Sequence, residues 1–576
     1  MFSKYYQQEL YHLRRLASEF AEVHPAIAPM LGTQSADPDV ERLLEGTAFL
    51  SGLLREKIDD QFPELIHALT HFIFPQFLRS VPSTTIVRFT PRRGMQESIL
   101  VPAGTEMESV PVEDVSCIFQ TSFDCLVHPL EITDISIIGS ESRGHRIDLT
   151  FRLTGPDLQA WFPETLTFFI GGSYSRASDL FYLLARRLKK ITVQSMDAKR
   201  RIVLEASSLK PAGFSRDRKM LPYPGNAFSG YRILQEFFLL PHKFLFFELH
   251  GLKDWKDRGR GDKFLISFEI SPSTVRIDGV SKDSFLLSTV PAINIYRHNA
   301  EPVPLDHTMD KIRITPALRS GKRPEIYSIE QVTGFTRGAM KQVNYVEASR
   351  FSSEKNIHMY STVHSMSPVY NRPEISLQFT YPDEEAPLVE ETLTIELICT
   401  DGDLPRQLKP GDICLPTSST PELIEFTNLI QPTMPIDPPL EGDLLWRLLS
   451  QLSLNLLSLA DRDNLRELLG LYISSQDRDK GRISSNRKRI DGIEEFSVTQ
   501  ESFMARGHML RGQKIKMIAR GDHFASRGDF CLFGMVMDNF FAEYCCFNSF
   551  TQFELTDNVS GETYTWPIRV GSKPLI

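Results

Sequence analysis

Apolar residues recur every three or four positions through the first 80 residues, the spacing that places them on one face of an α-helix. The first such segment ends at His24-Pro25, because the residue before a proline is driven out of the α region. The pattern therefore predicts an N-terminal amphipathic helix. Its apolar stripe comprises Tyr6, Leu10, Leu13, Ala17 and Phe20.

Two more helices are predicted before residue 80. Asp37-Pro38 supplies an N-cap and a first helical residue. Phe62-Pro63 divides the second helix from the third, which ends at Pro75. The three helices predict a helical bundle region over residues 1–80. The second stripe comprises Leu43, Leu44, Thr47, Leu50, Leu54 and Ile58, and the third comprises Leu65, Ile66, Leu69, Phe72 and Ile73.

From about residue 82 the apolar spacing changes to two, which predicts strands with one buried face. Residues 147–153 and 264–270 show this alternation clearly. We therefore expect residues 82–430 to be mostly β, in more than one domain, with a helix at 177–187.

Two aromatic stretches, 237–238 and 244–247, interrupt this β pattern. They could form a ligand platform, but buried strands are favoured. In a strand, Leu245 and Phe247 would face one side and Phe244 and Phe246 the other, so both faces would be apolar. A strand of this kind is covered on both faces, which predicts a second layer from another domain or subunit.

A proline-rich linker at 430–440 separates the β-rich region from the C-terminal part. A leucine-rich helix is expected from Asp443, and the last 85 or so residues return to strands that include an apolar segment, 530–544. The predicted fold class is therefore multidomain α+β. Its predicted domains are the helical region 1–80, a β-rich domain 81–275, a second β-rich domain 276–430 and a C-terminal α+β domain 431–576.

Composition and charge narrow the possible functions. The formal net charge of −9 disfavours nucleic acid as a partner, because nucleic-acid binders need a net basic face. The N-terminus lacks the apolar core of a signal peptide, and no stretch of ~18 uninterrupted apolar residues occurs. We therefore expect a cytoplasmic protein without direct membrane insertion. Seven cysteines without a CxxC pair indicate buried free thiols in a reducing compartment.

The sequence contains no GxSxG, Walker-type, GxGxxG or HExxH motif, so no catalytic residue, cofactor or metal is predicted. His67 and His71 share a helix face and could seat a metal, but polar contacts at a helix–helix or subunit boundary are favoured. The basic run 478–489 could grip an anionic surface, but a solvated loop is favoured. A carboxylate cluster could serve glycoside hydrolysis, but a solvated turn is favoured. That cluster comprises Asp383, Glu384, Glu385, Glu390 and Glu391.

Motifs along almost the whole chain resemble the TssF (ImpG, VasA) family of the bacterial type VI secretion baseplate. Each motif alone is modest, but their order along the chain is specific. One departure is Asp401-Gly402, where the family more often has Asn-Arg. The matching segments are 5–10, 20–21, 24–25, 37–46, 48–50, 59–63, 221–224, 230–238, 291–296, 301–302, 444–448, 453–455, 490–493, 530–534 and 547–551.

This resemblance implies a structural wedge component of the baseplate and no enzymatic activity. The implied partners are TssG, with two TssF copies per TssG, and also TssK, TssE, the spike hub VgrG and the contractile sheath. The implied location is the cytoplasm, with recruitment to the inner face of the cytoplasmic membrane through the assembled baseplate.

The apolar stripes exceed what isolated helices could bury, so we expect a helical interface with TssG or a second copy. The alternative is that these residues only pack on the neighbouring predicted helices. A different class of function, a multidomain β-rich carbohydrate-binding protein or hydrolase using the carboxylates at 383–391, stays open at this point. The predicted interface residues are Tyr6, Leu10, Leu13, Phe20, Leu43, Leu50 and Leu54.

Overall fold

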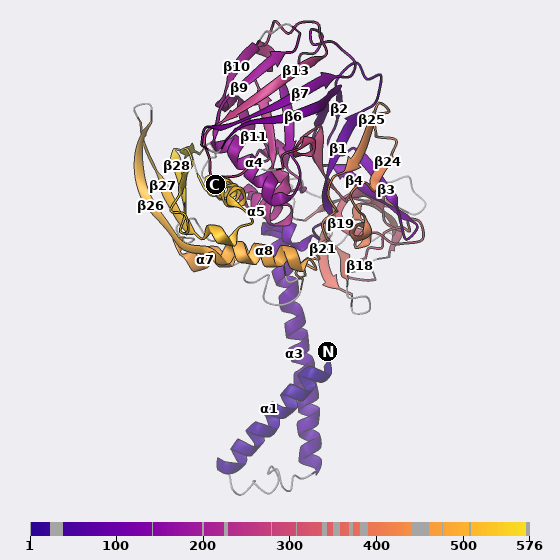
Figure 1. Cartoon of the computed structure of the whole chain (residues 1–576). Helices are drawn as coiled ribbons and strands as arrows, with labels where there is room; N and C mark the ends of the chain where they lie inside the picture. Colours follow the sequence, from indigo (N-terminus) through magenta and orange to yellow (C-terminus); the bar gives the residue numbers. More distant parts are fainter. Residues whose placement is uncertain are drawn as a thin grey trace.

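A computed structural model shows a helical arm that projects from a large β-rich body (Figure 1). Among the described residues, no helix is long and apolar enough to span a membrane. The structure describes the chain except for residues 1, 24–37, 141, 198–200, 224–227, 278, 307, 337–341, 349–357, 368–371, 381–389, 441–459, 475, 506–507, 546 and 572–576.

The arm consists of α1 (Phe2–Val23) and α3 (Pro38–Ile73), which cross each other outside the body (Figure 1). The prediction of separate second and third helices is wrong, because α3 continues through Pro63. A proline removes one backbone hydrogen bond and usually ends or kinks a helix. In a helix of 36 residues, the backbone hydrogen bonds of the turns before and after the proline are still formed. After α3, the short 3₁₀ turn η1 (Pro75–Leu78) leads into the body.

A six-stranded sheet begins the body and combines strands from distant parts of the chain. It takes strands from both sides of the predicted boundary at 275/276. The predicted domain boundaries themselves stay a prediction. In spatial order the strands are β24 (Ile413–Pro416), β3 (Glu106–Val112), β4 (Val115–Thr121), β15 (Thr289–Ile293), β1 (Thr84–Pro91) and β25 (Ile424–Asn428).

Two further antiparallel sheets pack face to face through aromatic residues. The ring of Phe168 on the second sheet lies edge-on to Phe151 and Phe268 on the first. The first sheet has the order β10 (Arg201–Glu205), β9 (Leu188–Ser195), β13 (Lys263–Ile270), β7 (Gly144–Leu153) and β6 (Leu130–Ser140). The second has the order β11 (Leu209–Pro211), β12 (Phe246–His250), β8 (Thr165–Ile170) and β14 (Phe285–Leu287), and a small sheet pairs β2 (Ile99–Val101) with β5 (Cys125–Val127).

The aromatic stretch 244–247 is fully buried, but only Phe246 and Phe247 lie in a strand, β12, because Phe244 belongs to the 3₁₀ turn η4 (Pro241–Phe244). Phe247 packs against Phe181 of α4 (Tyr174–Arg186), with ring centroids 4.6 Å apart. Phe246 points to the other face of β12 and packs against Phe123, with ring centroids 5.9 Å apart, so both faces are covered, as predicted. The predicted helix at 177–187 is confirmed by α4. Phe237, however, lies in helix α5 (Ser229–Leu239) and not in a strand.

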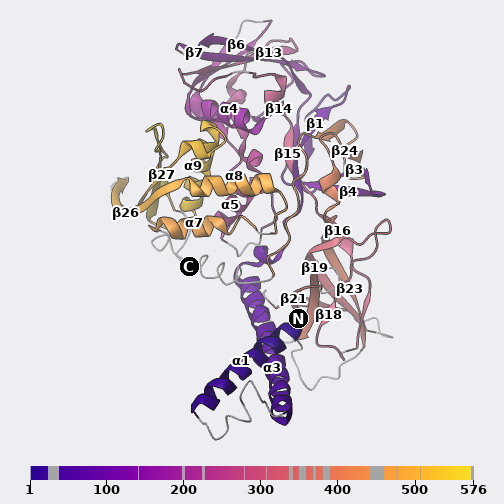
Figure 2. The same cartoon turned by 60° about the horizontal axis from the view of Figure 1, so that its bottom comes forward.

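An eight-stranded sheet has a hydrophobic core of its own, separate from the main core. Figure 2 shows this sheet beside the body end of α3, where α3 contacts β21. Its order is β16 (Tyr296–Asn299), β23 (Glu391–Thr400), β19 (Glu325–Thr336), β20 (Gln342–Glu347), β21 (Met359–Met366), β22 (Pro373–Thr380) and β18 (Ile312–Arg313), with β17 (Val303–Leu305) also paired to β23.

In its described residues, the C-terminal part combines three α-helices with a five-stranded sheet. The apolar segment 530–544 was expected among strands, but it forms the buried helix α9 (Arg527–Ala542). The predicted multidomain α+β class is confirmed, whereas the helix expected from Asp443 lies outside the described residues. The remaining elements are α7 (Arg462–Gly470), α8 (Lys480–Asp491), β26 (Ile493–Ala505), β27 (His508–Ala519), β28 (Ser549–Asp557), β29 (Thr563–Thr565) and β30 (Arg569–Val570).

Candidate protein–protein interface

The two helices of the arm are held together by ion pairs and by one close backbone contact. Glu9 pairs with Arg55 at 2.5 Å, and Arg14 pairs with Glu41. A Cβ atom at Gly52 would lie 3.2 Å from the backbone of Tyr6, so glycine allows α1 and α3 to approach closely there. The ion pairs include side chains that are partly open to solvent, and pairs of this kind each contribute little to stability.

Large apolar side chains on both helices of the arm remain exposed. Leu43 is 71% exposed, Leu50 is 62% exposed and Leu54 is 63% exposed. Residues 43, 50 and 54 are seven and four positions apart, so they share one face of α3. Contiguous exposed apolar surface of this kind typically marks a site of protein association. Further exposed apolar residues on the arm are Tyr11, Leu16, Phe20, Phe49, Leu53, Leu69, Phe72 and Ile73.

The structure divides the predicted interface residues into two groups. Tyr6, Leu10 and Leu13 are half-buried on α1. Phe20 on α1 and the three leucines on α3 are exposed. The half-buried group fits packing of α1 on α3, which was the alternative interpretation. A contact between either group and a partner stays a prediction.

The body end of α3 is fixed by two histidines. The ring nitrogens of His67 lie 3.2 Å and 3.0 Å from the carbonyl oxygens of His364 and Leu440. His71 lies 2.8 Å from the carboxylate of Glu347. Burial, with His71 and His67 close by, lowers the pKa of His364 to about 3. The predicted polar contacts of His67 and His71 are present, but they lie between α3 and the β-rich body and not between two helices, and they connect α3 to β21, β20 and the linker.

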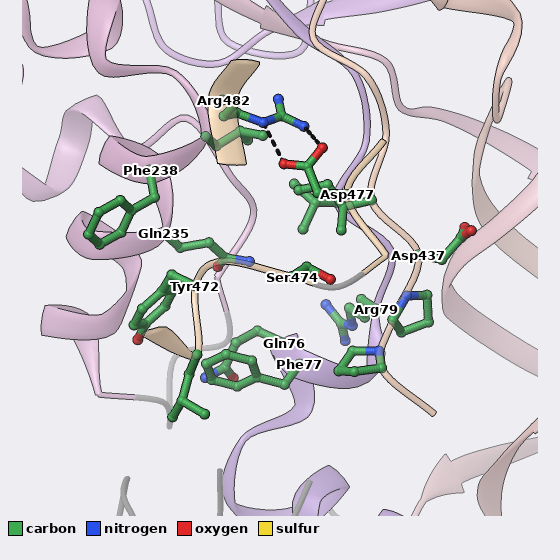
Figure 3. A pocket seen from close by; sticks show the side chains of 16 residues that line it. Gln76, Phe77, Arg79, Gln235, Phe238, Asp437, Tyr472, Ser474, Asp477 and Arg482 are labelled. Carbon is green, nitrogen blue, oxygen red and sulfur yellow. Dashed lines mark hydrogen bonds and ion pairs between the residues drawn. The ribbon is translucent and has the colours of Figure 1, made fainter. Parts of the chain in front are cut away.

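A small cavity lies where η1, α5, the linker and the C-terminal part meet (Figure 3). Phe77 and Tyr472 line it, and the ion pair between Arg482 and Asp477 lies beside it. Its volume of about 60 Å³ accommodates a few water molecules. Pockets that bind small molecules are several times larger, at roughly 300–1,000 Å³. The cavity is therefore a junction between structural elements and not a substrate site.

The sequence predicts a solvated loop for the basic run 478–489. This prediction is wrong, because most of the run forms the helix α8. Asp479 caps the helix by accepting hydrogen bonds from the backbone of Gly481 and Arg482. Arg482 pairs with Asp477 at 2.7 Å, and the buried Arg489 pairs with Asp529 at 3.0 Å. Several of its cations therefore neutralise carboxylates inside the chain and are not available to an anionic surface.

Three members of the carboxylate cluster, Asp383, Glu384 and Glu385, lie outside the described residues. Glu391 belongs to β23 and accepts a hydrogen bond of 2.8 Å from the Tyr345 hydroxyl. Among the described residues, no group of three or more His, Cys, Asp or Glu is placed to hold a metal ion. Burial raises the pKa of the Cys117 and Cys125 thiols to about 12, which leaves them unreactive at neutral pH.

A buried ionic cluster within the segment 230–243 was not predicted. Glu236 is fully buried and lies 2.6 Å from Lys243 and 3.2 Å from Arg232. It also accepts hydrogen bonds from the backbone of Met220 and Leu221. Burial favours the neutral carboxyl, but Lys243 and Arg232 outweigh it and hold the pKa of Glu236 below its usual range. The only signal in the sequence is the presence of charged residues inside an apolar run.

Comparison with known proteins identifies the family. Residues 1–573 match the family model described as Type VI secretion system, TssF. The chain belongs to the TssF family. The type VI secretion system component TssF1 of Pseudomonas aeruginosa is 29% identical in an alignment 629 positions long, gaps included, which covers 99% of each chain. The resemblance found in the sequence motifs is thereby confirmed.

Two solved structures have the same fold. A chain in the TssK-TssF-TssG baseplate subcomplex of a type VI secretion system superposes with a TM-score of 0.79 at 27% identity. That match covers 93% of this chain and 99% of the other. A chain from the baseplate complex of the type VI secretion system superposes with a TM-score of 0.63 at 22% identity, over the full length of both. The second match supports the TssF fold alone.

Proposed function

We propose that this TssF-family chain is a structural component of the type VI secretion baseplate and has no enzymatic activity. Membership of the family and likeness to a chain solved together with TssK and TssG support this proposal. The observation that carries it is the arm, a pair of helices outside the body whose apolar residues face solvent. Exposed apolar surface of this extent is typically buried by a partner.

The arm binds TssG together with a second copy of this chain. The exposed leucines of α3 supply one apolar face, and α1 supplies another through Phe20. Helices that present apolar residues at spacings of three and four pack with similar helices through interlocking side chains. A bundle of helices from two TssF copies and one TssG would bury both faces of the arm.

The body holds the remaining wedge proteins at fixed positions. TssK, TssE and the spike hub VgrG dock around it, and the assembled wedges start the contractile sheath. The chain lies in the cytoplasm and reaches the inner face of the cytoplasmic membrane through the assembled baseplate. This assignment rests on the family resemblance and on the extent of the β sheets, which provide a broad surface next to the arm.

Co-expression with the TssG protein of the same secretion system tests this proposal. The purified complex should have the mass of two copies of this chain and one TssG. A chain that stays a monomer in the presence of TssG under all conditions would contradict it.

The variant Leu10→Asp/Leu13→Asp addresses the arm directly, because it places charges on the half-buried stripe of α1. We expect the variant to lose the complex with TssG while circular dichroism shows that the β body remains folded. A folded variant that co-purifies with TssG as the wild type does would show that α1 is not required for the interface.

A further inference from the structure

The strand β26 lies at the outer edge of the C-terminal sheet (Figure 1). The strand order is β26, β27, β28 and β29, so β26 has a paired neighbour on one side only. It contains 13 residues, whereas strands of about 5–6 residues are the commonest. A long edge strand presents a row of backbone donors and acceptors to which another strand can pair.

Within the described residues, only the start of this edge is closed. The side chains of Arg466 and Arg462 donate hydrogen bonds to the carbonyl oxygens of Ile493 and Glu494. From Glu495 to Ala505, the described part of the chain provides no backbone hydrogen bond to β26 other than those of β27. This open part has no proline, and the register shift of β26 lies before it, between Ile493 and Glu495. Two of the devices that usually protect an edge are therefore missing.

Charges on one face of the sheet alternate from strand to strand. β26 carries Glu495 and Glu501, six residues apart and therefore on the same face. β27 carries Lys514 and Lys516, and both lysines pair with Glu554 of β28, at 3.0 Å and 4.0 Å. The order across the sheet is thus acidic, basic and acidic.

The two carboxylates of β26 are exposed, and within the described residues neither forms an ion pair or a side-chain hydrogen bond. Opposite charges on neighbouring strands stabilise a sheet, whereas like charges directly opposite each other destabilise it. A strand added beside β26 would therefore be favoured by lysine or arginine at positions that face Glu495 and Glu501. A second copy of β26 would place acidic residues near acidic residues.

We propose that β26 accepts an extended, basic segment of a partner protein as an additional strand of this sheet. The segment carries cationic side chains six residues apart on one face, in register with Glu495 and Glu501. Backbone hydrogen bonds to the open edge supply most of the affinity, and the two carboxylates select the partner and set the register. Near the end of β26, Phe503 is 42% exposed and offers an apolar contact to the same segment.

A nine-residue peptide, Thr-Lys-Val-Thr-Val-Thr-Val-Lys-Thr, serves as the probe on the full-length chain. Its two lysines are six residues apart on one face. Two control peptides have glutamate in place of both lysines, or proline in place of the three valines. Hydrogen exchange with mass spectrometry should show slower exchange of β26 amides with the lysine peptide and unchanged exchange with either control.

The variant Glu495→Gln/Glu501→Gln should weaken binding of the lysine peptide by roughly 2- to 30-fold, the effect of two cross-strand charge pairs. The variant Glu97→Gln/Glu422→Gln neutralises two exposed carboxylates elsewhere and should bind as the wild type does. Three results would overturn the proposal: no protection of β26 at millimolar lysine peptide, equal binding of the lysine and glutamate peptides, or a dimer of this chain that itself protects β26.

Discussion

Truncation of the exposed leucines on α3 is a quantitative test of the arm as an interface. Leu50 is 62% exposed and Leu54 is 63% exposed. Burial of a whole leucine side chain contributes about 1.5–3 kcal/mol, so burial of the exposed part of each contributes about 1–2 kcal/mol. The variant Leu50→Ala/Leu54→Ala should therefore weaken binding to TssG by about 2–4 kcal/mol, which is roughly 30-fold to several hundredfold in Kd.

The assay is titration calorimetry or biolayer interferometry with purified TssG. The free energy of unfolding of the isolated chain should change little, because these side chains already face solvent in it. The control is Leu318→Ala, which truncates a leucine of the body that is 57% exposed. An unchanged Kd for the folded double variant, or an equal loss for Leu318→Ala, would refute the assignment of the interface to this face of α3.

Three other substitutions test the interior of the structure. Glu236→Gln leaves Lys243 without its counter-charge in the core and should lower the free energy of unfolding in urea by about 3–5 kcal/mol. Gly52→Val places a Cβ 3.2 Å from the backbone of α1, so α1 should separate from α3 and become sensitive to limited proteolysis. Burial and two nearby aspartates raise the pKa of Glu325 to about 7, so this group binds a proton more tightly in the folded chain than in the unfolded one. The melting temperature should therefore fall as the pH rises from about 5 to about 8, and Glu325→Gln should flatten that dependence.

The first two predictions each have a control variant, and the third has a result that would contradict it. Glu425→Gln breaks an exposed ion pair with Arg92 and should cost less than about 1 kcal/mol. Gly46→Val has the same effect on helix propensity, but its Cβ meets no atom within 4 Å, so α1 should stay protected. If Glu325→Gln has the same pH dependence as the wild type, that carboxyl does not titrate differently on folding.

Periodicity was sufficient to predict the elements whose two faces differ. The alternation at 147–153 and 264–270 corresponds to β7 and β13, which each bury one face. The stripe of α1 and the helix α4 were predicted for the same reason, because polar and apolar residues separate at the helical period. The covering of both faces at 244–247 followed from four adjacent apolar residues, all fully buried in the structure.

Elements that are apolar all round could not be assigned in this way. In α9, residues such as Phe530, Phe533 and Phe540 are buried on every side, so no period distinguishes a helix from a strand. Phe237 of α5 was misassigned for a different reason: the adjacent pair 237–238 suggested a strand, although the polar residues of α5 recur at the helical spacing. The rule that a proline ends a helix gave the wrong result at Pro63. A proline removes one backbone hydrogen bond of the helix, but the chain can continue as a helix on both sides of it, as α3 does.

The interface residues were identifiable from the sequence, but their environment was not. The spacing of Leu43, Leu50 and Leu54 predicts a shared helix face and does not show whether that face is covered. The acidic edge of β26 depends on strand order, which places the strand of Glu495 and Glu501 next to the strand of Lys514 and Lys516, and that strand next to Glu554. Strand order arises from long-range pairing, and no local pattern in this sequence specifies it.

Because α3 is continuous, its number of residues sets both the length of the arm and the direction in which the arm's apolar face points. At 1.5 Å per residue, its 36 residues span about 54 Å between the free end of the arm and the body. An inserted residue near Gly46 would lengthen the arm by only about 1.5 Å but would turn its far end by about 100°. The direction in which the arm presents its apolar face is therefore set by the number of residues in α3, and an insertion of seven would nearly restore it where an insertion of two would not.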